Sequence, residues 1–366
     1  MSQAPDGRGA RKSDVLIVAD DITGALDSAG YFATPDRPVK VWFDAPACLS
    51  GNNAVDLDSR DLGEAAACER VAGVFAGRKP TAPALSFKKI DSVMRGHPIA
   101  EAVAAFRGGR FRRALFAPAF PAMGRVTVDG RQQVVSPHGA STVGPSLVDA
   151  LSSRGVPAAM IGDATARDGF VVADASSDAD LADAVAAFGE GSDDLYVGTG
   201  GLACVLAPAR AVGLRPPALD LAICGTNHPS TLRQIAAVSW LETFVMDGGD
   251  AMPSSPPFLL VAPSNALPEA VARHGIEQAL AQLVVDGPAP RAVLVTGGWT
   301  LRLLARICGA SHLLCEGLCE PGVAVSRMVA GPWNGTVVVS KSGGFGDDDL
   351  LARLLAPDMG GHPERG

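Results

Sequence analysis

Two adjacent carboxylates after the first apolar run are the residues of this chain best placed to do chemistry. Residues 15–19 are five apolar residues in a row, long enough for a strand buried on both faces of a parallel sheet. Asp20 and Asp21 follow where open α/β sheets bind ligands, and Thr23 and Gly24 open a helix whose free N–H groups attract anions. Helix capping would explain one aspartate. The pair therefore predicts a site where a metal, a transferred proton or a substrate hydroxyl uses the carboxylates.

A second group of charged side chains lies in residues 86–97, between a predicted strand and a predicted helix. Lys89 and Arg95 could bind a carboxylate or a phosphate. Asp91 could orient a hydroxyl, and Ser92 could bond a ligand oxygen. A solvated loop with internal ion pairs would explain the same residues equally well.

Two arginines could add to this edge of the predicted sheet. Arg60 comes just after the predicted strand 53–57, and Gly124-Arg125 follows the turn 118–121. An arginine after a strand is more often a surface residue, so each is weak evidence by itself.

The second half of the chain holds three turns rich in glycine and hydroxyl groups. Residues 225–231 and 296–300 follow predicted strands and open helices, and residues 341–346 follow a third strand. Glycines after a strand let backbone N–H groups approach phosphate oxygens. Three such turns in one domain indicate a nucleotide site, although none matches a Walker A or a kinase catalytic loop.

A fourth glycine turn, residues 198–203, nearly fits the dinucleotide-binding fingerprint. Asp220 lies about twenty residues on, as the ribose-binding acid would, but it begins a strand rather than closing one. We favour a tight turn that packs the last helix of the first domain. A nicotinamide-dependent dehydrogenase is the alternative that this segment leaves open.

Strand and helix patterns alternate along the chain, which predicts an α/β fold of two domains. Each domain would hold a mostly parallel sheet flanked by helices, with the active site in the cleft between them. We expect a polar tail at 1–13, a first domain at 14–210 and a second at 211–366, because prolines at 208–217 mark a linker. Strands are predicted at 14–19, 39–43, 53–57, 84–88, 113–117, 157–161, 170–173, 194–197, 219–225, 258–262, 291–296 and 335–340. Helices are predicted at 62–76, 97–107, 178–188 and 200–207. Residues 125–146 look like a long excursion or a hairpin.

Composition limits the classes of function. The 366 residues carry a formal charge of −8, without a large basic cluster, so nucleic acid is not an expected partner. We find neither a signal peptide nor an apolar run long enough to cross a membrane, and expect a soluble, cytoplasmic protein. The seven cysteines lack metal-site spacing, and we predict no metal held directly by side chains.

Taken together, these segments resemble the four-carbon acid sugar kinase family. The matching pieces occur in the family's order over about 330 residues and are 17–25, 88–92 with 95–96, 117–121 with 124–125, 197–203, 297–300 and 341–346. The resemblance implies a sugar-acid-binding N-terminal domain and an ATP-binding C-terminal domain. It also implies ATP-dependent phosphorylation of threonate, erythronate, their 3-oxo forms or similar acids, with Mg²⁺.

The resemblance also implies roles for individual residues. Asp21 or Asp20 would accept the proton of the attacking hydroxyl. We predict as sugar-acid ligands Thr23, Arg60, Lys89, Asp91, Ser92, Arg95 and Gly96. The resemblance implies ATP ligands at Thr226, His228, Gly297, Gly298, Thr300, Gly343 and Gly344, to which we add Trp299 and Lys341 as candidates.

Two positions depart from the family pattern, which usually has an acid at Trp299 and a small hydroxyl residue at His228. Trp299 could stack on the adenine or could simply pack. A catalytically weakened sensor of a sugar acid or a nucleotide is therefore the alternative function. Oligomeric state stays open, and a homodimer is one option.

Overall fold

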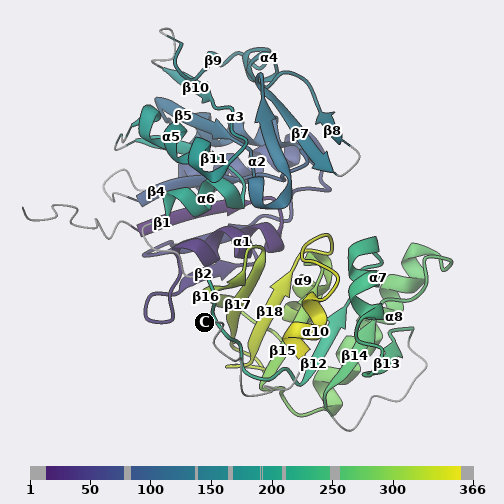
Figure 1. The fold of residues 1–366 in the computed structure, drawn as a ribbon. Helices are drawn as coiled ribbons and strands as arrows, with labels where there is room; N and C mark the ends of the chain where they lie inside the picture. Colours follow the sequence, from purple (N-terminus) through teal and green to yellow (C-terminus); the bar gives the residue numbers. More distant parts are fainter. Residues whose placement is uncertain are drawn as a thin grey trace, which may run out of the picture.

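The structure is a computed structural model that describes residues 14–77, 84–136, 139–163, 168–189, 191, 193–207, 212–247 and 256–355 (Figure 1). The predicted tail at 1–13 and the predicted domain boundary between residues 210 and 211 lie outside the described residues. Among the helices it describes, none is both long and apolar enough to cross a membrane.

The first half of the chain forms a parallel sheet around β1 (Asp14–Ala19). Its strands follow the order β2-β3-β1-β4-β11-β5-β10-β9. Their bounds are β2 (Val39–Trp42), β3 (Asn53–Asp56), β4 (Ala84–Lys89), β5 (Arg113–Ala117), β9 (Ala158–Met160), β10 (Gly169–Val172) and β11 (Asp194–Gly198). Apolar side chains of β1 point alternately to the two faces, with Val15 and Ile17 in one core cluster and Leu16 and Val18 in the other. Burial on both faces explains the uninterrupted apolar run.

Helices cover both faces of this sheet. On the face of Ile17 lie α1 (Ile22–Phe32), α5 (Asp178–Phe188) and α6 (Gly200–Leu206). On the opposite face lie α2 (Glu64–Ala76), α3 (Pro98–Gly108) and α4 (Leu147–Ser152). The predicted helices in this half agree with these bounds to within a few residues.

The predicted excursion at 125–146 is a small antiparallel sheet beside the large one. After a short 3₁₀ helix (Pro121–Met123) come β6 (Arg125–Val128), β7 (Arg131–Ser136) and β8 (Gly139–Val143). Asp129 and Gly130 join β6 to β7 with φ of 51° and 65°. Positive φ at both positions is typical of a two-residue hairpin turn, so Asp-Gly explains the tight reversal.

The second half of the chain forms a parallel sheet in the order β13-β14-β12-β15-β18, extended by antiparallel β17 and β16. The strands are β12 (Leu221–Cys224), β13 (Glu242–Val245), β14 (Phe258–Val261), β15 (Ala292–Thr296), β16 (His312–Glu320), β17 (Val323–Val329) and β18 (Val337–Lys341). The helices are α7 (Pro229–Ala236), α8 (Glu269–Asp286), α9 (Gly298–Ile307) and α10 (Leu350–Leu355). The predicted α/β class is confirmed.

The two sheets are joined edge to edge, which the sequence pattern does not indicate. Strand β16 pairs antiparallel with β2, so the described strands other than β6, β7 and β8 form one mixed, mostly parallel 15-stranded sheet. Strand β16 was not predicted from the sequence, and its register shifts after Cys315 and after Leu318. Gly30 lets α1 lie against β16, because a Cβ there would come within 2.2 Å of Leu318.

Candidate functional site

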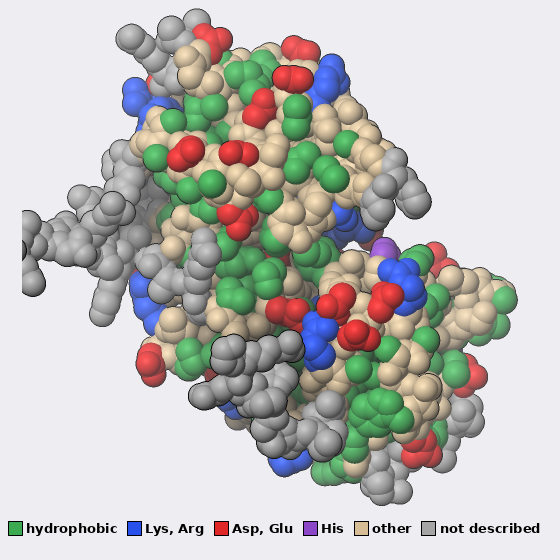
Figure 2. Space-filling view, viewed as in Figure 1, with side chains coloured by type: hydrophobic (Ala, Val, Ile, Leu, Met, Phe, Trp, Pro, Cys, Tyr) green, Lys and Arg blue, Asp and Glu red, His purple; other side chains and the backbone are tan. Residues whose placement is uncertain are grey.

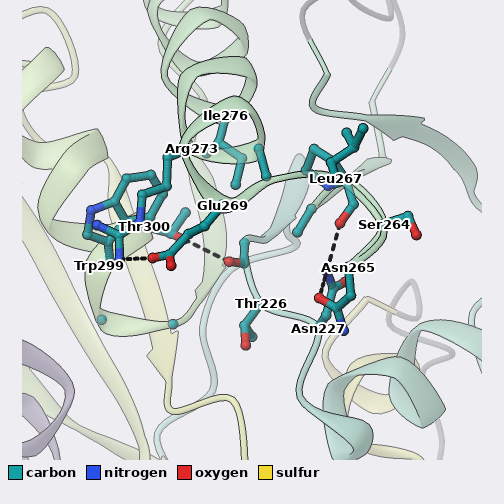
Figure 3. A pocket seen from close by; sticks show the side chains of 16 residues that line it. Thr226, Asn227, Ser264, Asn265, Leu267, Glu269, Arg273, Ile276, Trp299 and Thr300 are labelled. Atoms are coloured by element: carbon teal, nitrogen blue, oxygen red, sulfur yellow. Dashed lines mark hydrogen bonds and ion pairs between the residues drawn. The ribbon is translucent and has the colours of Figure 1, made fainter.

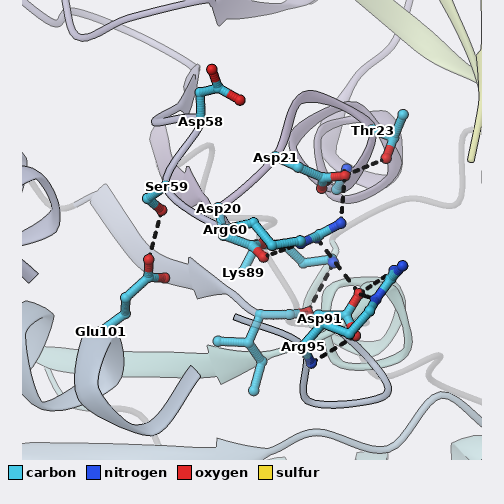
Figure 4. Close-up of polar contacts among 12 residues, drawn as sticks. Asp20, Asp21, Thr23, Asp58, Ser59, Arg60, Lys89, Asp91, Arg95 and Glu101 are labelled. Carbon is cyan, nitrogen blue, oxygen red and sulfur yellow. Dashed lines mark hydrogen bonds and ion pairs between the residues drawn. The ribbon is translucent and has the colours of Figure 1, made fainter. Parts of the chain in front are cut away.

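The predicted polar residues of the first half gather where three neighbouring strands end (Figure 4). Strand β1 pairs in parallel with both β3 and β4, so the carboxyl ends of all three share one edge. Asp20 and Asp21 follow β1, Arg60 follows β3, and Lys89 and Asp91 lie at the end of β4. The shared edge brings them together as expected for parallel strands.

Arg60 lies at the centre of this cluster. Its Nε donates to Asp20 Oδ2 at 2.7 Å, and its Nη1 donates to Asp21 Oδ2 at 2.9 Å. Its Nη2 lies 3.6 Å from Asp91 Oδ2. Burial opposes the charge of Arg60, but the neighbouring Asp20, Asp21 and Asp91 raise its pKa. The side chain predicted to bind substrate thus neutralises three carboxylates of the protein.

The two adjacent aspartates differ in depth. Asp20 is 4% exposed, and its Oδ1 has no hydrogen-bond partner among the described residues. Burial disfavours its charge, but Arg60, Lys88 and Lys89 outweigh burial and hold the pKa of Asp20 below the usual range. Asp20 is therefore a buried, charged support under the cluster.

Asp21 faces the space beside the cluster. It caps α1, since its Oδ1 accepts from Gly24 N at 2.8 Å, and its Oδ2 accepts from the Thr23 hydroxyl at 2.7 Å. Asp21, Thr23 and Gly24 all line one small pocket. Of the two aspartates predicted as alternatives for the base, Asp21 is the one in that lining.

The loop after β4 is held by a second ion pair. Arg95 donates to Asp91 Oδ2 from Nε at 3.0 Å and from Nη2 at 2.6 Å. Burial opposes the charge of Asp91, but the Arg95 hydrogen bonds and the Arg60 charge lower its pKa to about 2. Asp91, Ser92 and Arg95 line the same pocket as Asp21. Gly96, with φ of 72°, lies behind Arg60, where a Cβ would come within 3.3 Å of the Arg60 side chain.

Lys88, Lys89 and the buried Glu101 lie next to the cluster. Lys89 lines the pocket, and its Nζ donates to Ile90 O at 2.9 Å. Lys88 is fully buried and forms an ion pair with Glu101 at 2.8 Å. Glu101 also accepts the Ser59 hydroxyl at 2.6 Å, which ties α3 to the loop that carries Arg60. No local pattern marks Glu101, because its partners are distant in the chain.

Asp27 is a pocket residue to which the sequence pattern assigns no role. It is 4% exposed, lines the pocket with Asp21, and its Oδ1 has no partner among the described residues. Burial raises the pKa of Asp27 to about 6, although Lys89 opposes the shift. A charged residue among the small and apolar residues 24–30 is the signal that could have marked it.

A larger cavity lies in the second half, at the carboxyl ends of β12, β14 and β15 (Figure 3). Its volume is about 590 Å³, and five of the residues predicted to bind ATP line it: Thr226, Gly297, Gly298, Trp299 and Thr300. Its wall also includes Asn227, Pro263, Asn265, Glu269, Arg273 and Ile276. The N-terminus of α9, at Gly298, opens into the cavity, so free N–H groups face it.

Trp299 forms part of a stacked surface at this cavity. The side chain is 39% exposed, and the Arg273 guanidinium lies over the ring at 5.1 Å from its centroid. Arg273 in turn pairs with Glu269 at 2.6 Å. Figure 3 shows the three side chains along one side of the cavity.

The remaining predicted nucleotide residues lie beside this cavity. A Cβ on Gly343 would come within 3.0 Å of Thr226, and one on Gly344 within 3.3 Å of His228. Lys341 is buried, and its Nζ donates to Ser342 O at 3.1 Å and to Phe345 O at 3.2 Å, so the amine closes its own turn. Burial lowers the pKa of Lys341 to about 8.

Residues of the two halves meet around Asp21. A Cβ on Gly298 would lie 3.5 Å from Asp21 Oδ2. Ser342 and Phe345, from the turn after β18, line the pocket of Asp21, which leaves a free volume of about 30 Å³. The Phe345 ring packs edge-on against Phe120 of the first half at 6.4 Å. Figure 2 shows a notch at the border of the two halves, with basic side chains and a histidine beside it.

The fourth glycine turn packs the protein, as favoured from the sequence. A Cβ on Gly198 or Gly201 would come within 2.5 Å of a backbone carbonyl, and the buried Thr199 hydroxyl donates to Ala119 O at 2.7 Å. The carboxylate of Asp220 accepts hydrogen bonds from Arg291 N and Arg291 Nη2. In the part of the chain that the structure describes, no group of three or more His, Cys, Asp or Glu side chains could hold a metal.

Two family models match parts of the chain. Residues 15–149 match a family model described as a sugar-binding N-terminal domain, and residues 260–351 match one described as a nucleotide-binding C-terminal domain. A D-threonate kinase of Cupriavidus necator is 31% identical, over 92% of this chain and 96% of that protein. A D-threonate kinase of Bordetella bronchiseptica is 28% identical, over 92% and 95%.

A solved structure has the same fold. The Salmonella typhimurium LT2 protein, described as a putative tRNA synthase, aligns with a TM-score of 0.72 at 18% identity. The alignment covers 93% of this chain and 98% of that one.

Proposed function

Because this chain belongs to the four-carbon acid sugar kinase family, we propose that it phosphorylates a hydroxyl of a short sugar acid, using ATP. Threonate and erythronate are the acids we expect, since relatives are named D-threonate kinase and D-erythronate kinase. The cleft between the two halves would be the active site, and the cytoplasm the place of action.

The observation that carries the proposal is the proximity of Asp21 to the N-terminus of α9. An added Cβ on Gly298 would lie 3.5 Å from Asp21 Oδ2. A phosphate bound by the free N–H groups of α9 would therefore lie next to an acceptor hydroxyl bound at Asp21. The pocket of about 30 Å³ is too small for a four-carbon acid, so the halves would open to admit it.

In the proposed reaction, the hydroxyl oxygen of the sugar acid attacks the γ-phosphorus. The bond from that phosphorus to the β–γ bridging oxygen breaks, and ADP leaves. Asp21 receives the hydroxyl proton, and Arg60 limits the repulsion between the carboxylates around it. Such transfer is mostly a matter of positioning and charge stabilisation, which suits a cleft that closes over its substrates.

The sugar acid would bind on the side of the first half. Arg95 uses Nε and Nη2 on Asp91, which leaves further guanidinium donors for a substrate carboxylate, and Lys89 lies in the same lining. Ser92 and the unpartnered Oδ1 of Asp27 would bond hydroxyl groups of the acid. A buried carboxylate oxygen without a donor is costly, and a substrate hydroxyl would relieve that cost.

The nucleotide would bind in the 590 Å³ cavity, with Trp299 against the base and Thr226 and the glycine turns near the phosphates. Magnesium fits this arrangement, because proteins often hold it with one or two carboxylates together with phosphate oxygens. Asp21 is the carboxylate next to Gly298 that would hold it, through water. The ion would neutralise charge on the β- and γ-phosphates.

A substrate panel tests the proposal. The purified protein is incubated with ATP, Mg²⁺ and each stereoisomer of threonate and erythronate, and ADP and the phosphorylated acid are measured. We expect a phosphorylated acid with at least one isomer. Thermal stabilisation by ATP or an acid without any product would contradict the kinase and favour the sensor. Stabilisation by NAD and not by ATP would favour the dehydrogenase.

Removing the Arg95 guanidinium should weaken binding of the acid selectively. We expect Arg95→Ala to raise the KM for the sugar acid at least about tenfold, equal to about 1.4 kcal/mol, with the KM for ATP nearly unchanged. Initial rates at varied concentrations of each substrate measure both constants. Arg95→Lys, which keeps the charge but not the planar donors, should fall between. Equal rises in the two constants would exclude Arg95 from the acid site.

A methyl group on Gly298 should block the nucleotide without disturbing the fold. Its added Cβ would have only ordinary contacts, from 3.4 Å upwards. We expect Gly298→Ala to raise the KM for ATP at least about tenfold, with an unchanged unfolding midpoint. Gly73→Ala, in open space on α2, is the matched control and should leave the KM for ATP and the unfolding midpoint unchanged. A normal KM for ATP in the first variant would place the phosphates elsewhere.

A further inference from the structure

Arg302 connects the helix at the nucleotide cavity to the other half of the molecule. It lies on α9, one turn after Gly298 and on the same face. Its Nη1 donates to Asp56 Oδ2 at 2.7 Å and also to Phe43 O. Its Nη2 donates to Asp44 Oδ2 at 3.1 Å. One side chain of the second half thus binds the carboxyl ends of both β2 and β3.

Asp56 passes this contact on to the loop after β3. The residue is fully buried as the last residue of β3, and its second oxygen, Oδ1, accepts from Asp58 N at 2.9 Å. Asp58 has φ of 46°, a conformation that a non-glycine residue adopts only when its surroundings hold it there. The carboxylate of Asp56 therefore bridges α9 and the start of the loop.

The other end of this loop is part of the acidic cluster. Ser59 N donates to Asp20 O at 3.0 Å, and the Ser59 hydroxyl binds Glu101. The next residue is Arg60, which binds Asp20 and Asp21. Only three residues separate Asp56, which binds Arg302, from Arg60, which binds the proposed base. Each link on the way is a short hydrogen bond to a buried or half-buried group.

We propose that Arg302 is a positioning residue that couples the nucleotide cavity to the sugar-acid pocket. A nucleotide that holds the N-terminus of α9 fixes Arg302, and Arg302 fixes Asp56, the loop and Arg60. An acid whose acceptor hydroxyl binds Asp21, the partner of Arg60, restrains the same chain of contacts from the other end. This coupling rests on the proposed function, and it predicts that each substrate tightens the binding of the other.

The ion pair between Arg302 and Asp56 is buried, which favours a role in coupling over that of an ordinary surface ion pair. The Arg302 side chain is 22% exposed, and that of Asp56 is 1% exposed. Breaking an ion pair of this kind is costly, because it leaves an unpaired buried charge. Exposed pairs such as Arg306–Glu277, one turn further along α9, have side chains 69% and 50% exposed and stay within the second half.

The test is a binding cycle with β,γ-imido-ATP and Mg²⁺ as one ligand and D-threonate or D-erythronate as the other. Each affinity is measured by calorimetry with and without the second ligand. In the wild type, we expect each ligand to raise the affinity for the other on the order of 5- to 150-fold, which is the mutual increase in affinity. In Arg302→Gln, each ligand alone should bind within about twofold of the wild type, and the mutual increase should fall below about twofold.

Matched variants separate coupling from a general loss of structure. Arg306→Gln, on the same helix, should keep the full mutual increase. Asp56→Asn should lose it, and the double variant Arg302→Gln/Asp56→Asn should lose no more than either single variant, because both act through one contact. Arg302→Lys should restore part of it. Unfolding midpoints of all variants are measured alongside.

A pH series adds a readout that a purely structural role would not move. Burial raises the pKa of Asp56 to about 7, although Arg302 opposes the shift; Asp21 and Asp58 are the other charged groups that act on it. The charged form that pairs with Arg302 is therefore favoured as the pH rises through about 7. The mutual increase should grow over that range in the wild type and stay flat in Asp56→Asn.

The outcomes are distinguishable. A full mutual increase in folded Arg302→Gln would overturn the coupling, as would a wild type that binds both ligands independently. Loss of either ligand's own affinity in Arg302→Gln, matching the loss of the mutual increase, would also overturn it. A wild type that binds neither ligand would overturn the proposed function itself.

Discussion

Replacing Asp21 with asparagine should lower kcat by about 10²- to 10⁴-fold, the range for removing a general base. The amide keeps the shape of the side chain, and its one oxygen can still accept from Gly24 N, so the cap of α1 should persist. What the amide cannot do is take the proton of the attacking hydroxyl. Steady-state rates with saturating ATP and sugar acid measure the loss.

Two further measurements make this prediction specific to proton transfer. Without Mg²⁺, binding of β,γ-imido-ATP to Asp21→Asn should match that to the wild type, since the cavity lining of the second half is untouched. Asp61→Asn neutralises an exposed carboxylate one residue after Arg60 and should leave kcat within about twofold. Nearly normal turnover by Asp21→Asn would exclude it as the base. If Asp21→Asn lost affinity for the nucleotide in proportion to its loss of rate, Asp21 would be a binding residue instead of the base.

Replacing Arg60 with methionine should lower the free energy of unfolding by about 3–5 kcal/mol near neutral pH. The side chains involved are little exposed: 19% for Arg60, 6% for Asp20 and 5% for Asp91. Without the guanidinium, three neighbouring carboxylates repel one another in a poorly solvated place. Chemical denaturation measures the loss, and activity should fall with it because Asp21 loses its partner.

The loss of stability should depend on pH in a defined direction. The pKa of Asp91 is lowered from 3.8 to about 2, so its charged form stabilises the folded protein above 3.8. That stabilisation is lost as the pH falls toward about 2, and the pKa of Asp20 is lowered in the same direction. The gap between wild type and Arg60→Met should therefore be full near neutral pH and shrink in acid.

An exposed arginine provides the control. Arg112 pairs with Asp168 at 3.2 Å, with side chains 70% and 65% exposed. Arg112→Met should cost at most about 1 kcal/mol, the usual limit for a surface pair. If Arg60→Met were no more destabilising than Arg112→Met, or if its effect grew in acid, the carboxylates would not depend on Arg60 for their charge.

Local sequence patterns are enough to predict the strands and the edge where the polar groups gather. Apolar runs such as 15–19 mark strands buried on both faces, and parallel strands place their carboxyl ends on one edge. For that reason the pattern alone assigns Asp20, Asp21 and Lys89 to one cluster. The glycine turns at 225 and 297 belong to one cavity on the same ground, and both are in its lining.

The tertiary structure decided how deeply each of these groups is buried and which distant partners it contacts. Asp20 and Asp21 are equivalent in sequence, yet one is buried on Arg60 and the other lines the pocket. Asp27 stands out only in the structure, where it is buried and its Oδ1 has no donor among the described residues. Local periodicity carries no information about either, since side-chain depth is set by packing of the whole domain.

Contacts between residues far apart in the chain could not be predicted from local sequence patterns either. Arg302 and Asp56 are 246 positions apart, and they meet because β16 adds to the edge of β2 and draws α9 toward β3. No local pattern marks the join between the two sheets, because the pairing of β16 with β2 links segments that are far apart in the chain. The sequence by itself determined the elements and the type of chemistry. The join of the sheets determined which groups touch, because a contact so distant in the chain is specified only by the packing of everything between.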